Sequence, residues 1–269
     1  MCIRDSLGAM HNTPGDVGSY GLLYQWGRKD PFPAAPTLTG TTATVGAPIY
    51  DGDDNEIKIT NSSQSSTADN NLAFAIANPT VCLSNYAQFN TSRDWLQADM
   101  SNDALWGNPK GAERNETNDF LNKGAKSFYD PCPVGWRVPP ADVFRNFTAS
   151  GGYAWVIDDF DIADISGDGA KSLADYDYGW TFNLSDSASS YFPAAARFDG
   201  SYAMLMGSMS GLWGSYWGNA PYPGDMFQGG AYSVLSFQIK DTAGNEMITT
   251  SPAGGGARAD AYSVRCIRE

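Results

Sequence analysis

Short stretches with the residue pattern of β-strands lie near both ends of the chain. Residues 20–27 (YGLLYQWG) form an aromatic and aliphatic run, which the prolines of RKDPFPAAP then interrupt. Residues 232–239 and 261–267 alternate apolar and polar positions, which is typical of strands with one buried face. We therefore expect short strands in these three segments, the last two antiparallel.

Helical periodicity is confined to two short segments. Residues 69–77 (DNNLAFAIA) predict a short helix that ends at Asn78-Pro79, and residues 140–147 place apolar residues at helical spacing. Residues 37–67 are rich in Thr, Gly, Ser and Asp, so we expect loops with at most short strands there. The pattern predicts one α+β domain with short antiparallel strands, few short helices and long ordered loops.

Composition narrows the possible functions. Hydrophobic residues make up 42% of the 269 residues, enough for a core, and no apolar run approaches the roughly 18 residues of a membrane span. The net charge of −13 argues against nucleic acid as a partner, because its binders need basic patches. His11 is the only histidine, so neither a Ser-His pair nor a multi-histidine metal site is expected.

The first six residues look foreign to the rest of the chain. Residues 1–6 (MCIRDS) match the translation of a transposon end used in sequencing libraries. We interpret residues 1–6 as an artefact fused to an N-terminally truncated single domain at 7–269, so that Cys2 is not native. Any export signal would then have been lost with the original start, and its absence is no argument for the cytoplasm.

Three cysteines then remain, and two of them have distinctive surroundings. Cys132 lies between Pro131 and Pro133, whose rings fix their backbone φ angles. Cys266 lies in the alternating C-terminal stretch, and Cys82 lies in the apolar run TVCL. In an exported chain Cys132 and Cys266 would form a disulfide that closes a long loop, and two buried thiols are the alternative. Cys82 is expected to be a small core residue.

Several motifs occur in the order found in a known family. They are LGA at 7–9, GLLYQWGRKDPFP at 21–33, YDPCPVGWRVP at 129–139, YFPAAARFDG at 191–200, YWG at 216–218 and SVRCIRE at 263–269. Together they resemble the Fibrobacter succinogenes major paralogous domain (FISUMP-type) of surface and fimbrillin-associated proteins in Bacteroidota. The resemblance covers nearly the whole chain from Leu7, and its specific part is Cys-Pro-x-Gly-Trp combined with a terminal Ser-Val-Arg-Cys.

The resemblance implies a fold and an internal anchor. The family is similar to the formylglycine-generating-enzyme branch of the C-type lectin fold, in which the chain ends meet and long loops form the ligand face. A disulfide from Cys132 to Cys266 would then anchor the centre of the domain to the last strand. The resemblance also implies that a strand upstream of Leu7 is missing, which would leave an exposed sheet edge near residues 263–268.

A stretch rich in aromatic and polar residues is the first candidate ligand site. Residues 211–230 combine flat rings with amide, hydroxyl and carboxylate groups, as sites for sugars and for protein epitopes do. In the similar fold, loops before the final strands form the binding face. The candidate ligand-binding residues are Trp213, Tyr216, Asn219, Tyr222 and Asp225. The alternative is that the tryptophans fill the core beneath an ordered loop.

An acidic loop is the second candidate. Residues 158–169 (DDFDIADISGDG) offer carboxylates beside glycines that permit a tight loop, and calcium prefers such hard oxygen ligands. The candidate calcium ligands are Asp159, Asp161, Asp164 and Asp168. The spacing does not match the calcium loop of EF-hands, and a solvated acidic loop is the alternative interpretation.

No catalytic constellation stands out. The related oxygen-dependent enzyme uses a cysteine pair with copper, whereas Cys132 and Cys266 are expected to be structural, and no motif marks a carboxylate pair for glycoside hydrolysis. The sequence favours a non-catalytic domain, extracellular or at the outer-membrane surface, that binds a glycan or a surface protein. Two alternatives are a structural fimbrial or lipoprotein module that packs on a partner subunit, and a hypervariable diversity-generating binding protein.

Overall fold

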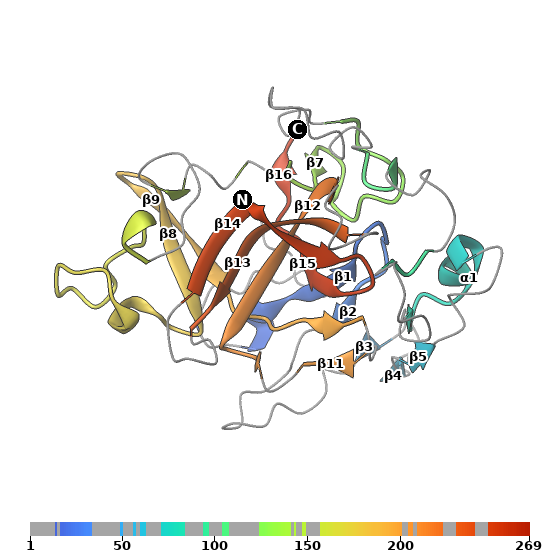
Figure 1. Ribbon diagram of the computed structural model, residues 1–269, viewed down its shortest axis with the longest axis horizontal. Coiled ribbons are helices and arrows are strands. Elements are labelled where there is room, and N and C mark those ends of the chain that lie inside the picture. Colours follow the sequence, from blue (N-terminus) through green and yellow to red (C-terminus); the bar gives the residue numbers. More distant parts are fainter. Residues whose placement is uncertain are drawn as a thin grey trace.

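Strands dominate the computed structural model of the protein. The structure describes residues 14, 17–33, 49–50, 56–57, 60–62, 71–83, 94–96, 104–107, 124–140, 143, 147–148, 157–200, 204–206, 209–222, 230–239 and 247–269. Residues 1–6, interpreted above as an artefact, lie outside these ranges. The mixture of many strands and few short helices confirms the α+β class (Figure 1).

The main sheet contains strands from both the N-terminal and the C-terminal part of the described chain. Its strands are β1 (Leu22–Gln25), β2 (Phe32–Pro33), β10 (Phe198–Asp199), β11 (Met204–Leu205), β12 (Trp213–Tyr222), β13 (Gly230–Gln238), β14 (Met247–Ala257) and β15 (Ala261–Ser263). The order is β11-β10-β15-β12-β13-β14, and β1 pairs with both β15 and β2. All pairs are antiparallel except β12 with β15, which run parallel.

Smaller elements surround this sheet. Four two-stranded pairs are β3 (Ile49–Tyr50) with β4 (Glu56–Ile57), β5 (Thr60–Ser62) with β6 (Val81–Leu83), β7 (Trp136–Arg137) with β16 (Ile267–Arg268), and β8 (Gly179–Ser185) with β9 (Ala188–Pro193). Within the described residues, the helical elements are α1 (Asn71–Ala77) and the 3-10 helices η1 (Val17–Tyr20), η7 (Ile157–Asp159) and η8 (Leu173–Asp175). The helix predicted over 69–77 is confirmed as α1, whereas most of the one predicted over 140–147 lies outside the described residues.

Strand β12 carries a core on each face. Tyr216 belongs to an aromatic cluster with Phe182, Phe192 and Phe237, which lies between the main sheet and the β8–β9 hairpin. The next residue, Trp217, belongs to a second cluster that we call the tryptophan core; it also contains Trp26, Trp95, Trp106 and Tyr262. Consecutive side chains of a strand point to opposite faces, so β12 is buried on both sides.

The tryptophan core ties together segments that are far apart in the sequence. Four indole N–H groups each donate a hydrogen bond to a backbone carbonyl. The pairs are Trp26 to Gly218 (2.9 Å), Trp95 to Trp26 (2.8 Å), Trp106 to Tyr129 (3.1 Å) and Trp217 to Tyr24 (2.7 Å). A buried indole N–H usually finds a hydrogen-bond partner, and here each of the four partners is a main-chain carbonyl.

The C-terminal segment differs from the expectation in two ways. The single strand predicted over 261–267 is split into β15 and β16 by residues 264–266, which belong to no strand. The expectation of an exposed sheet edge near 263–268 is wrong for β15, because β15 pairs with β1 on one side and with β12 on the other. β16 in turn pairs with β7, as Figure 1 shows at the top of the molecule.

Candidate functional site

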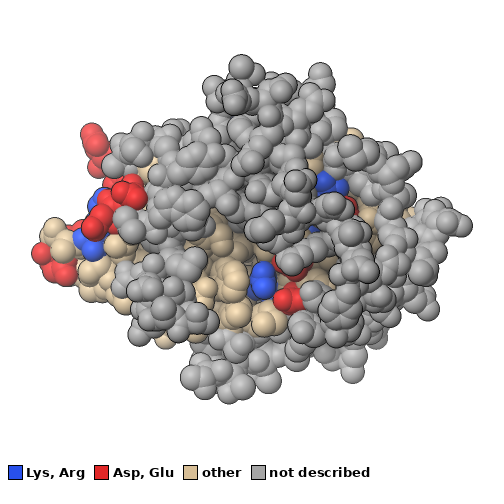
Figure 2. Space-filling model, in the orientation of Figure 1, with Lys and Arg blue, Asp and Glu red and all other residues tan. Residues whose placement is uncertain are grey.

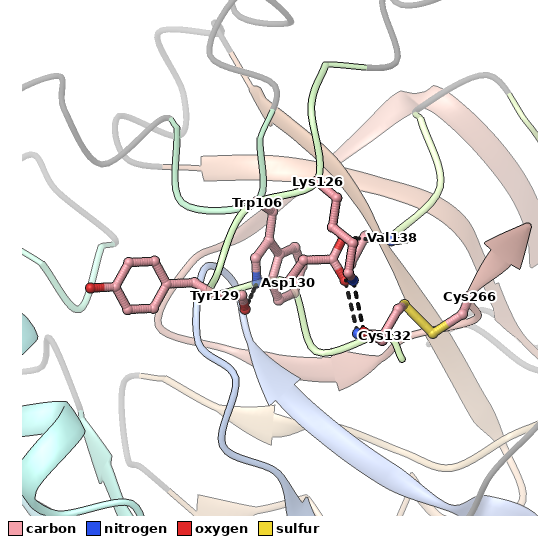
Figure 3. Close-up of a disulfide and its surroundings, with 7 residues drawn as sticks. All are labelled: Trp106, Lys126, Tyr129, Asp130, Cys132, Val138 and Cys266. Carbon is pink, nitrogen blue, oxygen red and sulfur yellow. Dashed lines mark hydrogen bonds and ion pairs between the residues drawn. A yellow bond between two sulfur atoms is a disulfide. The ribbon is translucent and has the colours of Figure 1, made fainter. Parts of the chain in front are cut away.

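The disulfide predicted between Cys132 and Cys266 is confirmed, and a buried carboxylate holds its first half in place. Asp130 Oδ1 accepts the backbone N–H of Cys132 at 2.8 Å, and Oδ2 accepts that of Val138 at 3.1 Å. Lys126 Nζ lies 2.8 Å from Asp130 Oδ1 and also donates to the Cys132 carbonyl at 2.7 Å. Figure 3 shows the carboxylate between the lysine and the cysteine, so the segment before the disulfide is fixed on both sides.

The segment after Cys132 makes a tight turn. Trp136 N donates to the Pro133 carbonyl at 2.9 Å, and Gly135 has a φ of 78°, which an L side chain rarely adopts. The turn leaves the Val134 side chain 95% exposed at its tip and directs the chain into β7. We call residues 130–136 the cysteine turn.

A cavity of about 500 Å³ lies where β1 and β15 part. The antiparallel register of the two strands ends at the pair of Leu23 with Ser263. Before Leu23 the chain bends through Gly21, at a φ of 62°, into η1; after Ser263 it runs toward the disulfide. Residues of both diverging arms line the space between them, and we call this space the fork cavity.

Aromatic rings and small polar groups make up much of the cavity wall. The lining residues are Ser19, Tyr20, Gly21, Leu22 and Tyr24 on one arm, Ser263, Val264, Arg265 and Cys266 on the other, Pro131, Pro133, Val134 and Trp136 from the cysteine turn, and Pro193 and Tyr216. Four of these are aromatic, and none is Asp, Glu, His or Lys. Such a wall can stack on a flat ligand and hydrogen-bond to it, and the described lining residues include no carboxylate or histidine.

Among the described residues that line the cavity, Arg265 is the one charged residue. It is 5% exposed, its Nη1 donates to the Tyr191 carbonyl at 2.6 Å and its Nη2 donates to Ser190 Oγ. The guanidinium carbon lies 4.2 Å from the centre of the Phe192 ring. Burial lowers the pKa of Arg265 to about 10, which still leaves it cationic at neutral pH. The guanidinium is thus held by Ser190, Tyr191 and Phe192, which are not among the described residues that line the cavity.

The tyrosines of the wall remain neutral over the physiological range. Burial raises the pKa of Tyr24 to about 12 and raises that of Tyr216 further above its ordinary value. The Tyr216 hydroxyl donates to the Pro193 carbonyl at 2.7 Å, which fixes its ring in the wall. Neutral phenols can both donate and accept hydrogen bonds.

The predicted ligand loop is in part a strand, and for two of its residues the expected exposure is wrong. Trp213, Tyr216, Asn219 and Tyr222 all lie in β12. Tyr216 and Asn219 are only 2% and 0% exposed, so neither is displayed on an outer surface as expected. Tyr216 does line the fork cavity, whereas Asn219 does not.

The other three residues of that set have different positions. Trp213 is half-buried, with its indole N–H directed to Ser215 Oγ at 2.9 Å and the Arg197 guanidinium 4.5 Å from its ring centre. Tyr222 pairs with Gly230 at the end of β12, and its side chain is outside the described part of the structure. Asp225 lies outside the described residues altogether. The ligand-binding role of Trp213, Tyr222 and Asp225 stays a prediction.

The acidic loop uses its carboxylates to hold its own backbone. Asp164 accepts the N–H of Gly167 at 2.6 Å and of Gly169 at 2.9 Å, and Asp168 accepts that of Ala170. Asp161 accepts from Asn183, and Asp159, like the others, is exposed. Figure 2 shows carboxylates gathered at the left of the molecule, where Figure 1 shows the segment that contains this loop. Among the described residues, no group of three or more His, Cys, Asp or Glu side chains is placed to hold a metal ion.

Apart from Tyr216, the residues of the fork cavity were missed by sequence reasoning. Tyr24, Trp136 and Arg265 belong to the motifs GLLYQWG, CPVGWRVP and SVRCIRE, respectively. The patterns of these motifs indicate strands and a disulfide, not residues that line one cavity. The cavity arises only from the divergence of β1 and β15, which sequence periodicity does not reveal.

Comparisons with known proteins add no evidence to this geometry. No family model, no curated protein and no solved structure matches the chain. In the part of the chain that the structure describes, no helix is long and apolar enough to cross a membrane.

Proposed function

We propose that the protein is a non-catalytic domain that captures a carbohydrate in the fork cavity. The observation that carries the proposal is the set of four aromatic residues, Tyr20, Tyr24, Trp136 and Tyr216, in the wall of one cavity beside Ser19 and Ser263. Sugars present apolar C–H faces that pack on aromatic rings and hydroxyl groups that need hydrogen-bond partners.

The size and accessibility of the cavity fit a small part of a glycan. Its volume of about 500 Å³ lies within the roughly 300–1,000 Å³ typical of small-molecule sites. Tyr24 and Trp136 are half-buried, so part of each side chain remains accessible, whereas Tyr216 is nearly fully buried and supports the wall. We therefore assign the principal stacking contacts to Tyr24 and Trp136.

Capture rather than turnover follows from the chemistry of the lining. Glycoside hydrolysis commonly uses two carboxyl groups on opposite sides of the scissile bond, and the described lining residues contribute none. The cysteine in the wall, Cys266, is bonded to Cys132 and is not a free thiol nucleophile. The proposal therefore keeps the non-catalytic assignment and moves the ligand site from residues 211–230 to the fork.

The setting that we propose is an exported domain of C-type-lectin-like fold on the cell surface. The disulfide supports export, because disulfides persist in oxidising compartments. The pairing of β15 with β1, and its parallel pairing with β12, are compatible with a fold in which the N-terminal and C-terminal segments meet. Residues 1–13 lie outside the described part, and the proposal does not depend on them.

A second candidate, a structural module that packs on a partner subunit, is favoured by two exposed apolar side chains. Phe128 is 79% exposed and Val134 is 95% exposed, and both lie in the segment around the disulfide. Exposed apolar side chains can mark a protein interface. A fimbrial subunit that covers this face would contact the cysteine turn and leave the cavity without a ligand.

A glycan array tests the proposal. We expect the full chain to bind a defined class of sugars, and Trp136→Ala to reduce the affinity at least about tenfold, because stacking on aromatic rings is lost. Leu184→Ala is the control, since Leu184 is exposed on β8, away from the cavity lining. Trp136→Phe, which keeps a ring, should retain part of the binding. No sugar binding, or equal binding by the Trp136→Ala variant, would favour the structural module.

A further inference from the structure

We infer that the sugar captured in the fork cavity carries an N-acetyl group, which the cysteine turn recognises. This inference rests on the proposed function and names the ligand class for the same site. The cysteine turn contributes Pro131, Pro133, Val134 and Trp136 to the cavity lining. It therefore presents a hydrogen-bond donor, the indole N–H of Trp136, together with three apolar side chains. An acetamido group needs both, because its carbonyl oxygen accepts hydrogen bonds and its methyl group is apolar.

The indole N–H of Trp136 differs from those in the tryptophan core. In that core, four indole N–H groups each donate to a backbone carbonyl. No hydrogen bond joins the Trp136 N–H to any described residue, and this atom is not among the fully enclosed, unpartnered polar atoms of those residues, so it keeps accessible surface. An indole N–H can only donate, and the partner that it lacks is therefore an acceptor oxygen.

Donation by this N–H is compatible with the stacking contact assigned to the same residue. The N–H lies in the plane of the indole, at its edge, whereas a sugar stacks on the face of the ring. A substituent that projects from the stacked sugar can therefore reach the edge. The backbone of Trp136 is held for such a contact, because its amide donates to the Pro133 carbonyl at 2.9 Å and β7 pairs with β16.

The apolar part of the cysteine turn favours an acetamido group over a plain hydroxyl. A sugar hydroxyl placed against Pro131, Pro133 and Val134 would lose water without gaining a hydrogen bond, which is unfavourable. The methyl of an acetamido group would instead remove apolar surface from water, since Val134 is 95% exposed. Its carbonyl would accept from Trp136 in the same turn. The turn thus matches both halves of the substituent.

The experiment compares N-acetylglucosamine with glucose, and N-acetylgalactosamine with galactose, by calorimetric titration of the full chain. We expect the acetylated member of at least one pair to bind about tenfold more tightly. Trp136→Phe keeps a ring and removes the N–H, so it should lower the ratio of the two affinities about fivefold. Val134→Ser removes apolar surface at an exposed position, so it should lower the ratio about twofold and leave the melting temperature unchanged. Leu184→Ser, on exposed β8, is the matched control and should leave the ratio unchanged.

Tyr24→Phe controls for the polar group of the other stacking residue. The Tyr24 hydroxyl likewise makes no hydrogen bond to a described residue and lies outside the set of fully enclosed atoms. Because we assign the acetamido group to the cysteine turn, loss of this hydroxyl should weaken both members of a pair by a similar factor. If Tyr24→Phe removes the preference and Trp136→Phe does not, the assignment to the cysteine turn is overturned.

The outcomes separate this inference from the proposed function. If glucose and galactose bind as tightly as their acetylated counterparts, the sugar site stands and the inference of an N-acetyl group is overturned. A preference that responds to neither Trp136→Phe nor Val134→Ser also overturns it, because the acetyl group would then be recognised elsewhere. If none of the four sugars binds, the array decides: N-acetylated sugars among its hits support the inference, and hits without an N-acetyl group overturn it. An array without any hit removes both the inference and the proposed function.

Discussion

Asp130 holds Cys132 by accepting its backbone N–H at 2.8 Å, so the half-cystine is positioned by a buried carboxylate two residues before it. The same carboxylate accepts the N–H of Val138 on the far side of the cysteine turn. One side chain thus closes the turn that supplies four lining residues of the fork cavity. The geometry of the disulfide and that of the cavity are therefore linked.

Asp130→Asn should destabilise the fold by about 2–3 kcal/mol, because the amide keeps one acceptor oxygen and turns an NH₂ group toward the other buried N–H. Chemical denaturation monitored by tryptophan fluorescence measures this free energy. Asp186→Asn, at the exposed turn between β8 and β9, is the matched control and should change little. Equal denaturation midpoints for the two variants would contradict the role given to Asp130.

Loss of the disulfide should weaken both the fold and the ligand site. The bond closes a loop with a sequence separation of 134, for which the chain-entropy model gives at most about 4–5 kcal/mol. Cys132→Ser and Cys266→Ser should lower the free energy of unfolding by similar amounts, because either change removes the same bond. A peptide map of the native protein, read by mass spectrometry, checks the pairing.

A reducing agent provides the control for the disulfide. It should lower the melting temperature of the wild type and leave that of the Cys132→Ser/Cys266→Ser double variant unchanged. A peptide map in which both native cysteines react as free thiols would disprove the bond.

The buried thiol of Cys82 should make the protein less stable at alkaline pH. Burial raises its pKa to about 12, above the roughly 8.5 of an unfolded thiol. Between these values the folded state holds the proton more tightly, so stability falls as the pH rises. From pH 8 to pH 10 this contribution amounts to about 2 kcal/mol of lost stability.

The variant Cys82→Ala isolates that contribution. Its free energy of unfolding should fall by about 2 kcal/mol less than that of the wild type between pH 8 and pH 10, since both proteins share all other titrating groups. The cavity left by the missing sulfur lowers stability equally at both pH values and cancels in the comparison. Parallel pH profiles for the two proteins would show that Cys82 is not desolvated as its burial indicates.

Calcium should not raise the melting temperature. The carboxylates of Asp164 and Asp168 accept hydrogen bonds from their own loop, and a metal ion would have to compete with these bonds. We therefore expect equal melting temperatures in millimolar calcium and in chelator, measured by differential scanning calorimetry. A calcium-dependent rise that Asp164→Asn abolishes would restore the acidic loop as a metal site.

The local features of the fold were accessible from the sequence where one pattern dominated. The helix α1 and the strands β1 and β13 follow from apolar periodicity, and the proline-flanked Cys132 indicated the disulfide. These features depend on residues close together in the chain or on a distinctive motif. The residues and the resemblance both indicated the pairing of Cys132 with Cys266, which the structure confirms.

Strand β12 shows why the rest was missed. Its sequence, WGSYWGNAPY, is rich in Gly, Asn and Pro and suggests a loop, but both faces are buried, so no alternation appears. Gly214 is required by packing: a Cβ there would lie 2.4 Å from the Phe237 ring. The small residues that suggest a loop in the sequence make room for aromatic rings from neighbouring strands in the fold.

The fork cavity could not be predicted because its wall comes from five separate parts of the chain. The arms around Tyr24 and Arg265 and the turn before Trp136 meet only after β1 and β15 have paired and then diverged. Motif order indicated that these segments belong together, but not that a space lies between them.

The central claim is that a sugar occupies the fork cavity, and a crystal structure of the full chain with the sugar that binds best on the array tests it most directly. The account predicts density for the sugar between Tyr24 and Trp136, with Arg265 in the wall beside it. Density for the sugar at another surface, with the fork cavity empty, would contradict the account.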